Sequence, residues 1–125
     1  MVDIDHQVAY WRDGAREEWQ VAEELLERGR IRHALFFTHL AVEKALKARV
    51  CRQTNDLAPR THNLVRLAEV AGVHPGTERL RVLTRLNDFC QAGRYPETPG
   101  PTLTAEQARQ HVADASEVFQ WLMNE

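Results

Sequence analysis

Long apolar runs and clustered cysteines are the first features that this sequence lacks. No stretch of its 125 residues approaches the ~20 consecutive apolar residues that a membrane-spanning helix needs. The N-terminus, Met1–Asp5, is acidic, whereas a secretory signal begins basic and then turns apolar. Only Cys51 and Cys90 are present, far apart and outside any C-x-x-C pattern, so we expect two unpaired thiols. These absences predict a cytoplasmic protein of one domain, residues 1–125, without a membrane partner.

The common motifs of catalysis and cofactor binding are also missing. Neither G-x-x-x-x-G-K-[ST] nor G-x-G-x-x-G occurs, which excludes a phosphate-loop enzyme. The six histidines show no H-x-x-x-H spacing. His39 and Glu43 could meet on adjacent turns, but no E-x-x-H pair from a second helix completes a metal site. The only serine, Ser116, has no identifiable histidine partner. We therefore expect no metal, no cofactor and no serine hydrolase chemistry.

Helical periodicity is what the sequence does contain. Apolar residues recur every three or four positions in each long segment, and no stretch alternates convincingly at period two. We predict an all-α fold, an antiparallel up-and-down bundle of four to five helices. The first two are joined so tightly at Gly29–Arg30 that they must lie antiparallel. The expected helices run from about 5 to 28, 31 to 52, 61 to 72 and 77 to 93, and from 104 onward.

Residues typical of helix ends set these boundaries. Side chains that favour N-caps precede four of the helices: Asp5, Thr61, Thr77 and Thr104. Gln107 stands three residues after Thr104, which predicts a capping box. Glycines end three helices: Gly29, Gly72 and Gly93. The segment 94–101 holds three prolines and is expected to form a loop.

Charge is segregated along the chain although the net charge is only −2. Residues 1–27 carry two basic and eight acidic side chains, residues 28–94 thirteen and five, and residues 95–125 one and five. The middle of the chain is therefore basic. Folded, it could attract an anion such as a nucleotide or RNA, or an acidic partner. Alternatively, the acidic terminal helices simply pair with the basic central ones.

The second helix carries an unusual row of polar residues. Its apolar and small side chains form two stripes, which predicts packing on at least two sides and a central place in the bundle. His39, Glu43 and Lys47 follow one another at spacings of four on the remaining face, with Glu43 N-terminal to Lys47 in the favourable order. Polar groups on so apolar a helix need partners, and a functional site is one way to supply them.

Five short motifs, in this order and spacing, resemble a known family. They are Tyr10-Trp11, Leu25-Leu26-Glu27-Arg28-Gly29-Arg30, Ala41-Val42-Glu43-Lys44-Ala45-Leu46-Lys47-Ala48, Thr61-His62-Asn63-Leu64 and Gly93-Arg94-Tyr95-Pro96. Together they resemble the stand-alone HEPN proteins, from about Tyr10 to Leu122. The resemblance implies a helical bundle that dimerises, often encoded beside a small nucleotidyltransferase as a toxin–antitoxin-like pair.

The same resemblance brings a ribonuclease motif into question. Many members of the family are metal-independent ribonucleases that carry an arginine followed four to six residues later by a histidine. Here Arg85 stands in the corresponding segment, but no histidine follows it before His111. We therefore expect no RNA cleavage.

The resemblance and the polar row together indicate a binding protein. We expect a nucleotide or a nucleotidyltransferase partner to bind in a cleft between the middle of the second helix and the Arg94–Pro96 turn. Lys47 and Arg94 would hold phosphate, Glu43 would position Lys47, and Tyr95 would stack on a base. The expected assembly is a homodimer.

Two alternatives stay open. The first is a ribonuclease toxin that uses Arg85 or Arg94 with His62 or His39 brought in from elsewhere in the fold. The second is a purely structural dimeric interaction module whose polar groups only organise the interface. A basic cleft across the dimer that holds an arginine and a histidine close together would favour the ribonuclease, whereas a Glu43–Lys47–Arg94 network sealed from solvent would favour the structural alternative.

Overall fold

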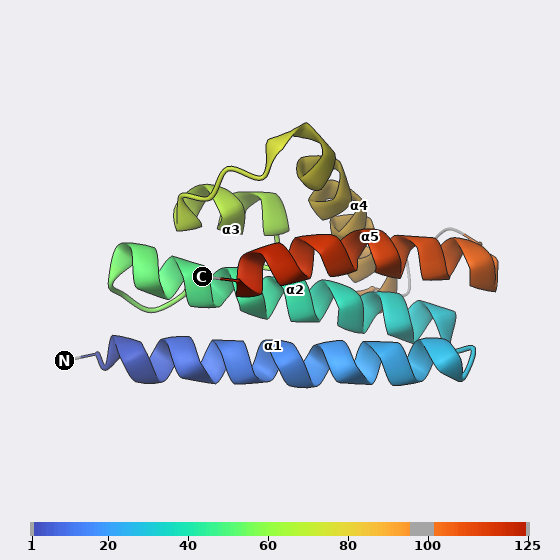
Figure 1. Ribbon diagram of the computed structural model, residues 1–125, viewed down its shortest axis with the longest axis horizontal. Helices are drawn as coiled ribbons and strands as arrows, with labels where there is room; N and C mark the ends of the chain where they lie inside the picture. The colour runs from blue at the N-terminus through green and yellow to red at the C-terminus, as the bar shows by residue number, and fades with distance from the viewer. Residues whose placement is uncertain (1, 96–101, 125) are drawn as a thin grey trace.

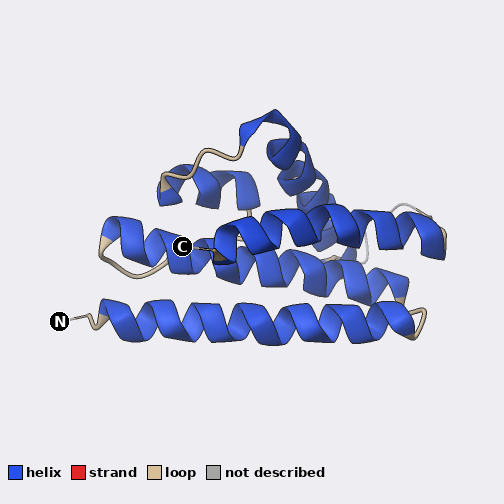
Figure 2. Ribbon diagram, in the orientation of Figure 1, coloured by secondary structure: helices blue, strands red, loops and turns tan. Residues whose placement is uncertain are grey.

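The computed structural model describes residues 2–95 and 102–124. Over these residues the chain is helical and contains no strand, which confirms the predicted all-α bundle (Figures 1 and 2). The helices are α1 (Ile4–Glu27), α2 (Ile31–Thr54), α3 (Leu64–Ala71), α4 (Gly76–Arg94) and α5 (Ala105–Met123). Pro96 and the rest of the proline-rich loop, 96–101, lie outside the described residues.

The two long helices form the expected antiparallel pair, because only three residues separate α1 from α2. Beyond them α4 crosses obliquely, and α5 runs along α2 so that both helices end at the same end of the bundle (Figure 1). Arg49 of α2 joins these two ends by donating to the main-chain oxygens of Leu122, at 2.8 Å, and Asn124, at 3.0 Å. Those oxygens would otherwise lack a partner at the end of α5.

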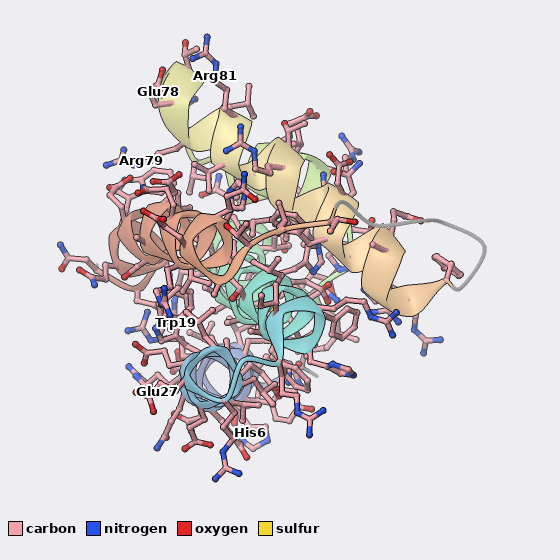
Figure 3. The ribbon with its side chains drawn as sticks, turned by 90° about the vertical axis from the view of Figure 1, so that its right-hand side faces the viewer. His6, Trp19, Glu27, Glu78, Arg79 and Arg81 are labelled. Atoms are coloured by element: carbon pink, nitrogen blue, oxygen red, sulfur yellow. The ribbon has the colours of Figure 1, made fainter. Side chains whose placement is uncertain are left out.

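Helix α2 is the centre of the bundle, as its composition predicts. It contacts each of the four other helices. In the view along the bundle it lies between α1 on one side and the layer of α4 and α5 on the other (Figure 3). That outer layer is tied together by Arg79 of α4, which binds Glu117 of α5 at 2.9 Å and covers the Trp121 ring. A helix enclosed in this way must satisfy its polar side chains inside the protein.

Three of the expected N-caps are wrong by one or more residues. Asp3, rather than Asp5, accepts the amide hydrogen of His6 and starts α1. Helix α4 begins after Pro75 without any side-chain cap, so Thr77 lies inside it. Gly76 supplies the turn at this point, with φ at +78°. The capping box of Thr104 and Gln107 is confirmed, with bonds of 3.1 and 3.0 Å.

The third correction concerns α3 and bears directly on the site. Asn63, rather than Thr61, caps this helix by accepting the amide hydrogens of Val65 and Arg66. Thr61 instead accepts the amide hydrogen of Asn63 at 3.2 Å. The helix therefore begins at Leu64, and residues 60–63 form a non-helical approach to α3 that lies beside α4.

The core has two parts. The main cluster draws buried apolar residues from all five helices, and a smaller one joins Val8, Ala48 and Cys51 with Trp11 packed against them. Both cysteines are buried free thiols. No helix among the described residues is long and apolar enough to cross a membrane.

Candidate functional site

The polar row of α2 is buried almost completely. His39 is 1% exposed, Glu43 3% and Lys47 6%, so water cannot satisfy their polar atoms. Their spacing of four places them on adjacent turns of one helix face. Each must therefore be satisfied by the protein itself, and the contacts of Glu43 show how.

Glu43 has two close hydrogen-bonded neighbours, and His39 Nδ1 lies farther away, 3.8 Å from Oε1. One carboxylate oxygen, Oε2, accepts a hydrogen bond from Lys47 Nζ at 3.0 Å, and the other, Oε1, lies 3.0 Å from Nδ1 of His62. A carboxylate can only accept, so Nδ1 of His62 carries a proton and donates it. Lys47 compensates the buried negative charge, and its Nζ also lies 5.1 Å above the Trp11 ring.

His39 binds the backbone of His62, and Glu43 binds the ring of the same residue. Its Nε2 lies 2.9 Å from the main-chain oxygen of His62 and must donate to it. Burial lowers the pKa of His39 to about 4, and the nearby Glu43 carboxylate opposes only part of that shift. The ring is therefore neutral near pH 7. Two buried side chains of α2 thus fix the position of His62, one at its carbonyl and one at its ring.

His62 itself is open to solvent on its other side. Its side chain is 47% exposed and lines a pocket of about 340 Å³ between the approach to α3 and the face of α4. Within the part of the chain that the structure describes, Nε2 of His62 has no hydrogen-bond partner. The other lining residues are Arg60, Thr61, Asn63, Asn87, Cys90 and Gln91.

Two asparagines join the walls of this pocket. Asn87 of α4 donates to the side-chain oxygen of Asn63 at 3.1 Å and accepts the amide hydrogen of Leu64 at 3.0 Å. With the caps from Asn63, the first amides of α3 are all bonded inside the protein. The N-terminus of α3 therefore offers no free amide to an anion, and any ligand must be bound by side chains.

Lys47 and Arg94, which we expected to hold one phosphate together, lie in different surroundings. The Arg94 guanidinium lies 5.4 Å above the Phe36 ring, at the beginning of α2. Phe36 and Lys47 are separated by roughly 16 Å along the helix axis, at about 1.5 Å per residue. Lys47 is turned toward Glu43 and Trp11 instead. The structure does not bring these two cations to a common point.

Arg94 does not line the pocket, but it interacts with one residue that does. It contacts the Cys90 thiol, one turn earlier on α4, and opposes part of the rise in the pKa of Cys90 that burial causes. Gly93 permits the close approach of α4 to α2, because a Cβ there would come within 2.6 Å of the Phe36 ring. Tyr95 follows as an exposed residue that ends α4.

Arg85 lies away from this pocket. It lines a different cavity, of only about 10 Å³, together with His111, Phe89 and Asp114. Burial, and then the charge of Arg85, lower the pKa of His111, and the ring is packed against Phe89 with centroids 5.3 Å apart. This cavity is too small for a ligand.

Sequence reasoning missed several residues of the pocket. Arg60, Asn63, Asn87, Cys90 and Gln91 were not among the expected site residues. Helical spacing offered one signal, since Asn87 and Gln91 lie four apart on α4, on the same face as the expected Arg94 region. No group of histidine, cysteine and acidic residues among those described could hold a metal ion.

Comparison with protein families gives one match. The model of the HEPN domain matches residues 8–125, nearly the whole chain. This chain belongs to the HEPN family. Neither a comparison with curated proteins nor one with solved structures gave a match. In this HEPN protein the family domain includes α2 to α5, all of α1 from residue 8 onward, and every residue of the pocket.

Proposed function

We propose that this HEPN protein binds a nucleotide through its phosphate, in the pocket beside His62. The observation that carries the proposal is how His62 is held in place by hydrogen bonds. Two buried polar side chains, His39 and Glu43, are used to fix one half-exposed histidine that lines a pocket. Burying polar groups is costly, and a preorganised ligand-binding group is a reason to retain them.

The charges around the pocket favour an anion. Arg60 lines it, Arg94 interacts with Cys90 of its wall, and neither arginine has a carboxylate partner among the residues described. The one acidic side chain bonded to His62, Glu43, is already compensated by Lys47. Arginine is well suited to phosphate because its planar guanidinium donates two parallel hydrogen bonds.

The size of the pocket favours a small ligand. A volume of about 340 Å³ lies near the lower end of the range for small-molecule sites, which suits one nucleotide rather than a folded RNA. We assign Tyr95 to stack on the base, since it is exposed and follows Arg94 directly. Asn63, Asn87 and Gln91 supply further polar groups along the walls.

Calorimetric titration with AMP and ATP tests this function. Wild type should bind at least one of them, and Arg60→Ala, His62→Ala and Arg94→Ala should each weaken binding by roughly 1–3 kcal/mol, the range for lost charge-assisted hydrogen bonds. Arg109→Ala is the matched control, because Arg109 is an exposed arginine of α5 outside the pocket. Wild type that binds neither nucleotide would refute the proposal.

RNA cleavage is the second candidate, and one observation favours it. The Glu43 carboxylate bonded to a histidine ring beside arginines is an arrangement that supports proton transfer. His62 would then replace the histidine that is missing after Arg85. The test is incubation of purified protein with RNA: we expect no cleavage above background, and cleavage that His62→Ala abolishes would establish the ribonuclease instead.

The partners of the protein are a further part of the proposal. We expect a homodimer, and a small nucleotidyltransferase as a second partner, on the basis of family membership. Sedimentation at micromolar concentration tests the dimer, and a single species of ~14 kDa would exclude it. Co-expression with a nucleotidyltransferase encoded by an adjacent gene, followed by affinity purification, tests the second partner.

A further inference from the structure

The hydrogen bonds of the site decide which nitrogen of His62 can meet a ligand. Nδ1 donates to Glu43, so in the neutral ring Nε2 carries no proton and presents a lone pair. An anionic oxygen also presents lone pairs, so it cannot form a hydrogen bond to neutral Nε2. The other tautomer would protonate Nε2 but would leave Oε1 of Glu43, whose side chain is only 4% exposed, facing a second lone pair.

Protonation resolves this conflict without breaking the bond to Glu43. A proton from solvent on Nε2 makes the ring a cation that donates to Glu43 at one end and to the anion at the other. The negative charge needed to support that cation is already in place 3.0 Å from Nδ1. His62 is also half exposed, so Nε2 can exchange protons with water.

The other ionisable groups around His62 keep the same charge between pH 6 and pH 8. On α2, His39 is neutral in this range because burial lowers its pKa to about 4. On α4, burial raises the pKa of the Cys90 thiol, so it remains protonated. Arg60 before α3 and Arg94 on α4 are permanent cations. Lys47 is bonded to the far oxygen of Glu43 and does not contact His62.

We infer that anion binding in this pocket takes up one proton, at Nε2 of His62, so that the site binds its ligand more tightly as the pH falls. This inference rests on the proposed function and adds its regulation. Neutral His62 leaves the pocket with a lone pair facing the anion, and protonated His62 gives it a third cation beside Arg60 and Arg94.

Sulfate is the probe that separates this effect from titration of the ligand. Sulfate remains a dianion from pH 5 to 9, whereas a phosphate monoester itself gains a proton near pH 6. Binding would be followed by NMR through the signals of His62, Asn63 and Asn87, at constant ionic strength. We expect the Kd for sulfate to fall by about tenfold or more from pH 8 to pH 6, with tenfold per pH unit as the limit for one proton.

Two variants assign the proton to its residue. His62→Gln keeps a donor that can reach the anion but cannot titrate, so its sulfate affinity should be nearly constant over this range. His74→Gln is the matched control, because His74 is an exposed histidine outside the pocket, and it should retain the pH dependence. Thermal melts of both variants establish that they are folded.

The outcomes distinguish the two proposals. Equal affinity of wild type for sulfate at pH 6 and pH 8 would overturn the proton-linked inference and leave anion binding intact. The same pH dependence in wild type and His62→Gln would also overturn it, because the proton would then bind elsewhere. Absence of both sulfate and nucleotide binding at every pH would overturn the proposed function, and the inference with it.

Discussion

Each of two faces of helix α4 borders a cavity lined by an arginine and a histidine, and only one of them forms a site. On one face, Arg60 and His62 line a pocket of about 340 Å³. On the other, Arg85 lies beside His111 around a cavity of about 10 Å³. The two pairs have the same chemistry in the sequence, but they differ in space and in the partners of the histidine.

The partners account for the difference. The His62 ring is bonded to a buried carboxylate and its backbone to a buried histidine, so one nitrogen is left to face a pocket. The His111 ring packs on Phe89, and burial together with Arg85 lowers its pKa, which favours a neutral, structural ring. An arginine and a histidine become a candidate site only where a third group orients the histidine and a cavity admits a ligand.

Removing Glu43 should have the largest effect, because it abolishes the contacts that distinguish His62 from His111. Glu43→Ala leaves Lys47 buried without its counter-ion and His62 without its ring partner, so we expect a loss of roughly 3–5 kcal/mol in the free energy of unfolding. Ligand binding should weaken as well. Urea unfolding of wild type and variant measures the first effect, and nucleotide titration measures the second.

Glu117→Ala is the matched control for this loss. Glu117 also forms a close pair, with Arg79 at 2.9 Å, but its side chain is 58% exposed. Solvent screens such a pair, so its removal should cost only a small fraction of the Glu43 effect. Equal losses in the two variants would mean that the Glu43 network is no more important to the fold than a surface ion pair.

Lowering the pH should reduce the stability of the folded protein, because His39, which holds the His62 backbone, becomes protonated. Its pKa is lowered from 6.5 in the unfolded chain to about 4 in the folded protein, so the unfolded chain binds the proton more tightly. The stabilisation is complete above pH 6.5 and is lost as the pH falls toward 4, by about 3 kcal/mol in total. Urea unfolding at pH 7, 5.5 and 4.5 measures this dependence.

A variant without the titrating ring tests the assignment to His39. His39→Gln should lower stability at pH 7 but should also flatten the pH dependence between 6.5 and 4, because glutamine can donate to the His62 carbonyl without titrating. His111→Gln should retain most of the dependence of wild type. If wild type and His39→Gln lose stability equally over this range, the buried neutral His39 is not the cause.

Much of the fold was accessible to sequence reasoning because it depends on local patterns. The period of the apolar residues gave the helices, and the short Arg28–Arg30 connection gave the antiparallel pair. Two of the three wrong caps lie where several good cap residues stand close together, and the third lies where α4 begins without any side-chain cap. Asp3 competes with Asp5, and Asn63 competes with Thr61, and the winner depends on which turn tertiary packing makes helical.

The site was only partly predictable, for a different reason. The His39–Glu43–Lys47 row follows from helical spacing within α2, and the bond between Glu43 and Lys47 is confirmed at 3.0 Å. The approach of His62 to Glu43, and of Asn87 to Asn63, depends on how α3 and α4 pack on α2. Spacing within one helix does not reveal those contacts between segments.

Removing the positive charge of Lys47 should reduce stability more than removing that of Arg94. Lys47→Met keeps the aliphatic cover on Trp11 but removes a buried charge-assisted bond, so we expect a loss of roughly 1.5–3 kcal/mol in stability. Arg94→Met should change stability by less, because Arg94 is exposed and its contact with Phe36 is a cation–π interaction. Thermal and urea unfolding compare the two, and a larger loss for Arg94→Met would reverse the assignment.

The smallest effect on ligand binding is expected for substitution of Arg85, which lies on the face of α4 that borders the His111 cavity. Arg85→Ala should leave nucleotide affinity within about twofold of wild type, since no ligand can enter a cavity of about 10 Å³. It should still act on its neighbour: removing the positive charge should raise the pKa of His111, while burial, the larger cause, keeps that pKa below its usual value. NMR titration of the His111 ring measures the pKa change, and calorimetry measures the affinity. A strong loss of affinity in Arg85→Ala, with Arg60→Ala unaffected, would mean that the ligand binds at the His111 face of α4 and not in the pocket beside His62.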